Sequence, residues 1–320
     1  MTARAAVIGR GDVSVVHLAA IRKLPGIELA GVCDIDPDRA GDGYADHREL
    51  IDAVRPDVVH ICTPHDQHVP IAIDCLDRGV HMLIEKPVAH TVDEADRLIA
   101  AAKEHPELKV GVCLQNRYNL AARAAYDLLR SGELGTVRGG SATVLWHREP
   151  AYYRSRPWRG DRARSGGGVV INQAIHTLDL LEWLLGDVVG LHGHAGRYGL
   201  DGIDVEDTAH ALLQHAGGAR SVFFATVTNV ADSPVTVEID TERATLLIRG
   251  DLTVSFADGR TEVVAERRAG PDGRAYWGAS HEQLIADFYG TLPDPAPFWI
   301  GPEEGTRSLR LVHQIYRQQA

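Results

Sequence analysis

The segment Ala5–Ser14 reads AAVIGRGDVS, and the predicted fold depends on it. Four apolar residues form a short strand, two glycines form a tight turn, and a helix begins at Ser14. This is the G-x-G-x-x-G pattern with serine at the third glycine, a position that needs only a small residue. The backbone can approach a pyrophosphate at such a turn, and the helix N-terminus presents free N–H groups to it. The sequence therefore predicts dinucleotide binding, with a simple glycine turn as the alternative, at Gly9, Gly11, Asp12, Val13 and Ser14.

Short apolar runs alternate with helical patterns over the first 115 residues. We expect strands at 5–8, 27–33, 57–62, 80–85 and 109–114, and helices at 14–23, 46–54, 68–78 and 91–104. Strands that alternate with helices in this way indicate a doubly wound parallel sheet. Their nearly uniform apolar character suits strands that are buried on both faces.

The pattern changes after residue 118. We expect a helix at 119–131, a strand at 137–146, an arginine-rich loop at 147–165 and a long apolar helix opened by Gly166-Gly167-Gly168. Residues 187–266 read as consecutive strands, several with period-two alternation, which is typical of an antiparallel sheet. Two helices close the chain, at 279–291 and 303–318. The prediction is an α/β protein with a Rossmann domain at 1–118 and, at 119–320, an α/β domain with an open, mainly antiparallel sheet for substrate binding and oligomerisation. Its closing helix can pack back on the first domain.

Charge and composition exclude several classes of protein. The 44% of hydrophobic residues is ordinary for a globular chain. The net charge of −11 argues against binding to nucleic acid or to an anionic membrane surface. No apolar run reaches the ~18 residues of a membrane span, and no signal-peptide pattern follows Met1. The four cysteines include no C-x-x-C pair, so we expect buried, reduced thiols. These features predict a cytoplasmic protein.

Asp34 ends the second predicted strand, 20 residues after Ser14. A carboxylate at this place hydrogen-bonds the ribose hydroxyls of an adenosine and repels a 2′-phosphate. Arg10 and Arg39 could instead hold such a phosphate, and a solvated loop acid is a further alternative. We expect NAD(H) as the cofactor, with NADP(H) as the alternative.

Further motifs stand at matching distances along nearly the whole chain: Thr63 to His68, Glu85-Lys86-Pro87, Gln115 to Asn119, the three glycines with His176 and Asp179, and Asp287-Phe288-Tyr289. With these motifs the chain resembles the glucose–fructose oxidoreductase / inositol dehydrogenase / MocA (Gfo/Idh/MocA) family. The resemblance implies a Rossmann domain followed by an open-faced α/β domain, in a dimer or tetramer. It also implies that a nicotinamide cofactor oxidises or reduces a carbinol carbon of a sugar, cyclitol or sugar derivative, nucleotide-activated sugars included.

Lys86 is one of only four lysines among 33 basic residues. It follows an apolar strand at the sheet edge where ligands bind, and an ammonium there can stabilise a developing alkoxide. A surface lysine that ends a strand is the alternative. In the resembled family this lysine is catalytic, and it can also contact the cofactor.

His176 lies on the helix that Gly168 opens, four residues after Asn172, so both point to one helical face. Histidine can take the carbinol proton as the hydride leaves, although a lone histidine is more often a core residue. Many relatives carry an aspartate where this chain has Asn172, and an amide can only hydrogen-bond a substrate hydroxyl. Asp179 is predicted at the substrate site, where it can orient His176, and a solvent salt bridge is the alternative. Arg117 is predicted to contact substrate or cofactor.

The resemblance also implies a set of residues around the cofactor. Thr63, Pro64 and His68 match a loop that lines the nicotinamide ribose, although a turn and a helix cap are the simpler interpretation. Glu85 resembles a partner of the cofactor ribose or of the lysine, and Gln115 is expected at the cofactor.

Aromatic and arginine side chains crowd the segment before the three glycines. They suit stacking on a sugar ring or holding a phosphate or carboxylate, and a structural flap or an oligomer contact is the alternative. Among them Tyr153 and Trp158 are candidate substrate contacts. The sixteen histidines show no metal-binding constellation by spacing.

Three functions remain open on the sequence. The first is the NAD(H)-dependent oxidoreductase, and the second is an NAD-dependent glycosidase that oxidises transiently, eliminates and reduces again. The third is a cofactor-bound sensor without catalysis, against which both Lys86 and His176 argue. The strands at 205–266 carry apolar residues on both alternations, which predicts a homodimer or homotetramer built on this sheet.

Overall fold

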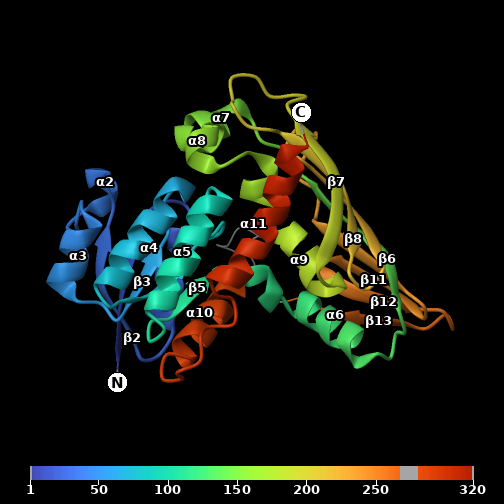
Figure 1. Ribbon diagram of the computed structural model, residues 1–320, viewed down its shortest axis with the longest axis horizontal. Coiled ribbons are helices and arrows are strands. Elements are labelled where there is room, and N and C mark those ends of the chain that lie inside the picture. Colours follow the sequence, from blue (N-terminus) through green and yellow to red (C-terminus); the bar gives the residue numbers. More distant parts are fainter. Residues whose placement is uncertain (1, 267–279, 319–320) are drawn as a thin grey trace. The chain divides into compact units, whose positions relative to one another are not determined.

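The computed structural model describes residues 2–266 and 280–318. Backbone contacts divide the chain into two compact units. The first contains Met1–Gln115 and His281–Thr306, and the second contains Asn116–Ser280 and Arg307–Ala320. The first unit is therefore discontinuous in sequence, and Figure 1 shows its late segment, α10, in red beside blue and cyan elements.

The first unit is built on a five-stranded sheet in the order β2-β1-β3-β4-β5. All of its pairs are parallel, as predicted. The strand order changes direction between β1 and β3, and ligands bind at the carboxyl ends of strands at such a switch point. The strands are β1 (Ala3–Ile8), β2 (Ile27–Cys33), β3 (Val58–Ile61), β4 (His81–Ile84) and β5 (Val110–Val112).

Helices connect these strands and cover the sheet. Asp46 and Thr91 cap α3 and α5 by accepting hydrogen bonds from backbone N–H groups of the first turn. A methyl group on Gly111 would lie 2.8 Å from the Phe288 ring, so the glycine in β5 lets α10 pack closely. The helices are α1 (Ser14–Lys23), α2 (Pro37–Ala40), α3 (His47–Val54), η1 (His65–Gln67), α4 (His68–Asp77), α5 (Val92–Glu104) and α10 (Ser280–Gly290).

The second unit contains an eight-stranded sheet in the order β13-β12-β11-β10-β6-β9-β8-β7. Only the pair β6–β9 is parallel, so the prediction of a mainly antiparallel sheet is confirmed. The strands are β6 (Val137–Leu145), β7 (Val188–Gly196), β8 (Thr208–His215), β9 (Arg220–Thr226), β10 (Thr236–Thr241), β11 (Ala244–Arg249), β12 (Asp251–Phe256) and β13 (Thr261–Val264).

The helices of the second unit differ from the prediction in two places. The segment 147–165, expected to be a loop, contains short helices, and the helix after the three glycines begins with a π-helical turn. Residue 279, the expected start of the penultimate helix, lies outside the described residues. The helices are η2 (Gln115–Tyr118), α6 (Leu120–Ser131), α7 (Pro150–Arg154), η3 (Pro157–Gly160), α8 (Arg162–Ser165), the π turn (Val170–Ala174), α9 (Ile175–Leu185) and α11 (Pro302–Arg317), which begins in the first unit.

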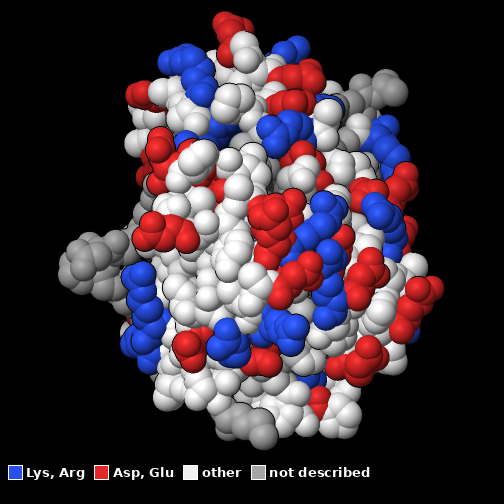
Figure 2. Space-filling model, turned by 90° about the vertical axis from the view of Figure 1, so that its left-hand side faces the viewer, with Lys and Arg blue, Asp and Glu red and all other residues white. Residues whose placement is uncertain are grey.

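The four cysteines are buried free thiols, as predicted. Burial raises the pKa of Cys33 to about 12, so its thiolate is scarce at neutral pH. Within the described ranges, no helix combines the length and apolar character that a membrane crossing requires. On the face drawn in Figure 2, acidic and basic side chains are intermixed, and no broad basic field is visible there.

Candidate functional site

The glycine loop after β1 has the backbone geometry that a pyrophosphate site needs. Gly9 has a φ of +86°, and a methyl group there would lie 2.7 Å from the backbone carbonyl of Cys62. At Gly11 the nearest atom to such a methyl would be 4.0 Å away, so the backbone is open to a ligand. No side chain caps α1, and its first turn holds no acidic residue. The N–H groups of this turn therefore suit a phosphate, and the residues present fit a dinucleotide.

Asp34 lies at the carboxyl end of β2, directly beside this loop. It is 8% exposed, and its Oδ2 accepts a hydrogen bond from the Arg10 N–H at 2.7 Å. Its Oδ1 accepts another from the Asp36 N–H at 2.9 Å. The two arginines considered for a 2′-phosphate are engaged elsewhere, because Arg39 pairs with Asp36 and Arg10 donates to the Arg39 carbonyl. The geometry therefore favours an unphosphorylated ribose at Asp34 over a ribose that carries a 2′-phosphate.

The segment after β3 is fixed by His68. This ring is fully buried, with Nδ1 2.7 Å from the Pro87 carbonyl oxygen and Nε2 3.0 Å from that of Thr63. His68 thus joins the Thr63–Pro64 turn to the Lys86–Pro87 segment, which is a different role from the expected cofactor contact. The Thr63 Oγ1 is buried and has no hydrogen-bond partner among the described residues, so it suits a bound ligand.

Glu85 and Lys86 follow β4 and differ in their surroundings. Glu85 is 4% exposed, and its carboxylate contacts His17 at 3.0 Å and His281 at 3.3 Å. Its Oε1 thus contacts two buried rings and its Oε2 accepts from the Lys86 backbone N–H, while a contact of Glu85 with the cofactor ribose stays a prediction. Lys86 is half-buried at the carboxyl end of the sheet, where the sequence placed it. Gln115 is buried at the start of η2.

The three glycines of the second unit allow the backbone to approach a buried glutamate. A methyl group on Gly168 would lie 1.9 Å from the Glu206 carbonyl oxygen, which no side chain could tolerate. The Glu206 carboxylate accepts hydrogen bonds from the N–H groups of Gly168 at 2.8 Å and Val170 at 3.2 Å. The Tyr316 hydroxyl also donates to it, at 2.7 Å. Glu206 was not among the predicted site residues, because it is 38 residues distant from Gly168 and no spacing signal joins the two.

His176 and Asn172 lie at the junction of the π turn and α9. His176 is 9% exposed, and Asn172 is half-buried with its N–H donated to the Gly168 carbonyl at 3.0 Å. A π turn inserted in an α-helix is rare and frequently marks a functional site. The extra residue changes the face presented by the following side chains. The four-residue spacing therefore does not by itself place Asn172 and His176 on one α-helical face.

Arg117 and Asp179 form a buried ion pair within the second unit. Arg117 is 2% exposed and Asp179 is 1% exposed. The Arg117 Nε lies 2.8 Å from one carboxylate oxygen, and Nη2 lies 2.7 Å from the other. This two-pronged geometry is that of a structural pair. The structure therefore contradicts a solvent salt bridge for Asp179 and gives Arg117 a buried ionic partner. The contact of Arg117 with substrate or cofactor stays a prediction.

The aromatic candidates before the glycines are divided between core and surface. Tyr153 is 4% exposed and packs with Ile203 and Val205, so it belongs to a small core cluster and not to an open stacking platform. Its half-buried neighbour Tyr152 carries the Arg159 guanidinium 4.2 Å from the ring centre. Trp158 is half-buried on η3.

Both units match models of known protein families. Residues 3–112 match the model of an oxidoreductase family with an NAD-binding Rossmann fold. The fold and the glycine loop thus place this chain in the class of proteins that carry an NAD-binding Rossmann domain. Residues 122–247 match the GFO/IDH/MocA C-terminal domain. Within that class, the chain belongs to the Gfo/Idh/MocA family.

Named relatives include sugar and cyclitol dehydrogenases. D-apiose dehydrogenase of Paraburkholderia graminis is 31% identical over 228 residues, which cover 68% of this chain and 59% of that protein. Inositol 2-dehydrogenase of Rubrobacter xylanophilus is 30% identical over 195 residues, covering 56% and 51%. The matched stretch thus spans little more than half the length of these relatives. The WlbA dehydrogenase from Bordetella pertussis, solved with NADH and UDP-GlcNAcA, has a TM-score of 0.85 at 25% identity, covering 99% of this chain and 96% of that one.

Proposed function

We propose that this protein is an NAD(H)-dependent oxidoreductase that transfers a hydride to or from a carbinol or keto carbon of a sugar, cyclitol or sugar derivative. The observation that carries the proposal is Lys86, half-buried at the carboxyl end of β4, on the edge of the sheet that also bears the glycine loop. Sugar and cyclitol dehydrogenases among the relatives support the substrate class.

The cofactor fits the loop at Gly9–Ser14 and the carboxylate of Asp34, and when bound its nicotinamide accepts or gives the hydride. The Lys86 ammonium stabilises the substrate oxygen as its charge develops. His176 takes the proton of the carbinol, or returns it in the reverse direction. Asn172 orients a substrate hydroxyl, because an amide can hydrogen-bond but cannot carry a proton.

Assembly through the outer face of the second sheet is part of the proposal. Leu212 on β8 and Val222 on β9 are neighbours in the strand register, and they are 47% and 51% exposed. A groove of about 420 Å³ beside them is also lined by His192, His194 and His210. Apolar side chains that cluster on one sheet face indicate an interaction surface, so we infer a homodimer or homotetramer. Four reduced thiols support a cytoplasmic location.

Turnover on a panel of sugars, cyclitols and nucleotide-activated sugars tests the reaction. Lys86→Ala should lower kcat by roughly 10² to 10³, because one oxyanion donor is lost. His176→Ala should lower kcat by roughly 10² to 10⁴. If Lys86 and His176 act together, the fold-loss of kcat in the double mutant should be much smaller than the product of the two single-mutant losses. Lys103→Ala is the matched control, since this lysine is 68% exposed.

The same assay separates the alternatives. A Lys86→Ala enzyme that keeps nearly full kcat would overturn the assignment, whereas loss of NADH binding in that variant would make Lys86 a cofactor ligand. Release of an aglycone from a glycoside without net NADH would indicate the glycosidase. A wild-type protein that binds NADH but turns over no compound would indicate the sensor.

A further inference from the structure

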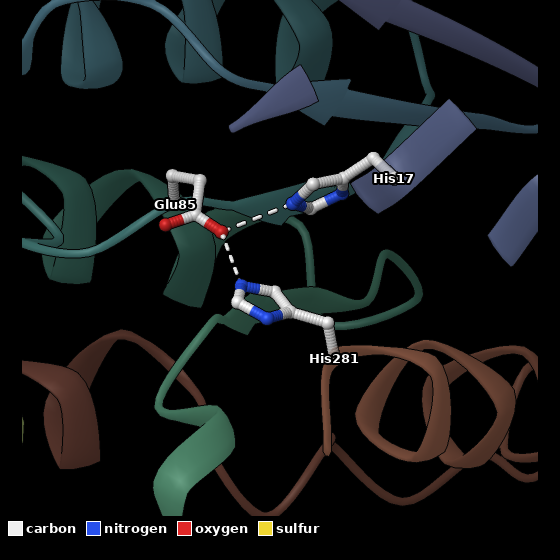
Figure 3. A group of neighbouring side chains, drawn as sticks. All are labelled: His17, Glu85 and His281. Atoms are coloured by element: carbon white, nitrogen blue, oxygen red, sulfur yellow. Dashed lines mark hydrogen bonds and ion pairs between the residues drawn. The ribbon is translucent and has the colours of Figure 1, made fainter. Parts of the chain in front are cut away.

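Five polar side chains form a continuous chain in the first unit, which we call the Glu85 chain: the half-buried Tyr289 and the buried His60, His17, Glu85 and His281. Tyr289 Oη lies 2.9 Å from His60 Nε2, and His60 Nδ1 lies 2.8 Å from His17 Nδ1. His17 Nε2 lies 3.0 Å from Glu85 Oε1, and His281 Nε2 lies 3.3 Å from the same oxygen. Figure 3 shows both rings directed at this oxygen.

The acceptor at the end of the chain determines where each proton lies. An ionised carboxylate can only accept, so His17 Nε2 carries a hydrogen and donates it to Glu85. In a neutral ring His17 Nδ1 must then accept, which requires His60 to donate from Nδ1. His60 Nε2 in turn accepts from the Tyr289 hydroxyl. All donations therefore run in one direction, from α10 through β3 and α1 to Glu85.

Burial and hydrogen bonding agree with this assignment. Desolvation is the main reason that the pKa of His17 and of His60 is lowered, so both rings are neutral. Burial alone would raise the pKa of Glu85, but the hydrogen bond from His17 and the contact with His281 outweigh it and hold this pKa well below the usual range. The chain thus keeps one negative charge inside the first unit.

This charge lies against the backbone N–H of Lys86. Glu85 Oε2 accepts a hydrogen bond from the Lys86 backbone N–H at 3.3 Å, and His68 contacts the Pro87 carbonyl oxygen at 2.7 Å. The peptide group before Lys86 and the peptide group after Pro87 are therefore held by buried side chains. The titratable groups whose electrostatic environment includes Glu85, or which adjoin it in the chain, are His17, His60, His68, His281, Cys62, Cys113 and Lys86. Among the described residues named here, Lys86 is the lysine, and it belongs to the set because it adjoins Glu85 in the chain.

We propose that the Glu85 chain is a positioning relay that fixes an ionised carboxylate beside Lys86 and thereby keeps this lysine in its ammonium form. A nearby negative charge favours a protonated lysine. The assignment of Lys86 to the reaction rests on the proposed function, but its protonation can be measured without turnover. Tyr289, His60, His17 and His281 act through Glu85 and are positioning residues.

Lysine NMR gives a direct test, because the chain contains only four lysines. The protein is labelled with ¹³C at lysine Cε, the Lys86 signal is identified by Lys86→Arg, and each signal is followed against pH. Glu85→Gln should lower the proton affinity of Lys86 by about tenfold and leave Lys103 unchanged. Glu282→Gln is the matched control, because it removes the carboxylate 2.7 Å from Lys23 Nζ and should affect Lys23 alone.

An unchanged Lys86 titration in folded Glu85→Gln would overturn the proposal. Should that variant fail to fold, ¹⁵N spectra of the wild-type histidines decide, and a neutral His17 ring with its proton on Nδ1 would exclude donation to Glu85. A stoichiometric Zn²⁺ ion retained by the wild type and lost with His281→Ala would also overturn it, since His17 Nε2 could not then donate. If the wild type turns over a substrate, the basic limb of its pH profile of kcat/KM should move to lower pH in Glu85→Gln. If it turns over none, the proposed function is refuted, and the lysine titration still tests the relay.

Discussion

Replacement of Asp179 by asparagine should destabilise the second unit strongly, because the change removes one charge from a pair that water does not reach. Arg117 and Asp179 are 2% and 1% exposed, and two hydrogen bonds of 2.8 and 2.7 Å join them. The asparagine preserves the shape of the side chain but leaves a buried guanidinium without its counter-charge. Breaking a buried pair from one side costs about 3–5 kcal/mol.

Thermal and urea unfolding measure this loss. At roughly 2–4 °C per kcal/mol, the Tm should fall by at least about 6 °C. Asp187→Asn is the matched control in the same unit, because Asp187 is 70% exposed in its pair with Arg307 and should lose under about 1 kcal/mol. Replacing both partners by apolar residues, as Arg117→Met with Asp179→Leu, should recover much of the loss.

A loss of stability in Asp179→Asn no greater than that in Asp187→Asn would contradict a stabilising buried pair. So would an Arg117→Met protein with unchanged unfolding and a raised KM alone. Those two results together would support the predicted contact of Arg117 with the substrate.

Two further predictions concern the cofactor and the assembly. Asp34→Ala should reduce the ratio of NADH affinity to NADPH affinity, since the carboxylate that repels a 2′-phosphate is gone. Fluorescence titration measures the affinity for both cofactors. Tighter binding of NADPH than of NADH by the wild type would contradict the assignment of Asp34 to the ribose. Leu212→Lys should shift a dimer or tetramer toward the monomer in light scattering, whereas Val230→Lys, at a side chain 91% exposed outside the strands, should not. A monomeric wild type at micromolar concentration would rule out the surface.

The fold could be predicted because strand and helix periods are local properties. β2 spans Ile27–Cys33, as the apolar run indicated, and the Asp46 and Thr91 caps mark helix starts by their residue type. The short helices of 147–165 were missed although signals were present, since Pro150 lies in the first turn of α7 and Asp161 caps α8. The π turn at Val170–Ala174 has no comparable signature, because the turn and α9 are buried on nearly all sides and offer no one-sided apolar period that an extra residue could shift.

The candidate site could be predicted only where a motif is contiguous. Gly9 and Gly11 lie in the expected turn, and Lys86 lies at the expected sheet edge. Partners that are distant in sequence could not be found: Asp179 meets Arg117 62 residues away, and Glu206 meets Gly168 38 residues away. A lone histidine such as His17 or His281 carries no spacing signal, so the chain that ends at Glu85 emerges only in three dimensions.

The discontinuous first unit has a consequence for synthesis on the ribosome. Chains emerge from the N-terminus, and early domains generally fold before later ones are made. Here Met1–Gln115 must wait for His281–Thr306. Until then β5 lacks Phe288, and the carboxylate of Glu85 lacks the ring of His281 and the phenol that begins its hydrogen-bond chain. All five strands of the nascent Rossmann sheet are therefore made long before the helix that covers β5, and the surroundings of Lys86 are complete only after α10 has been translated.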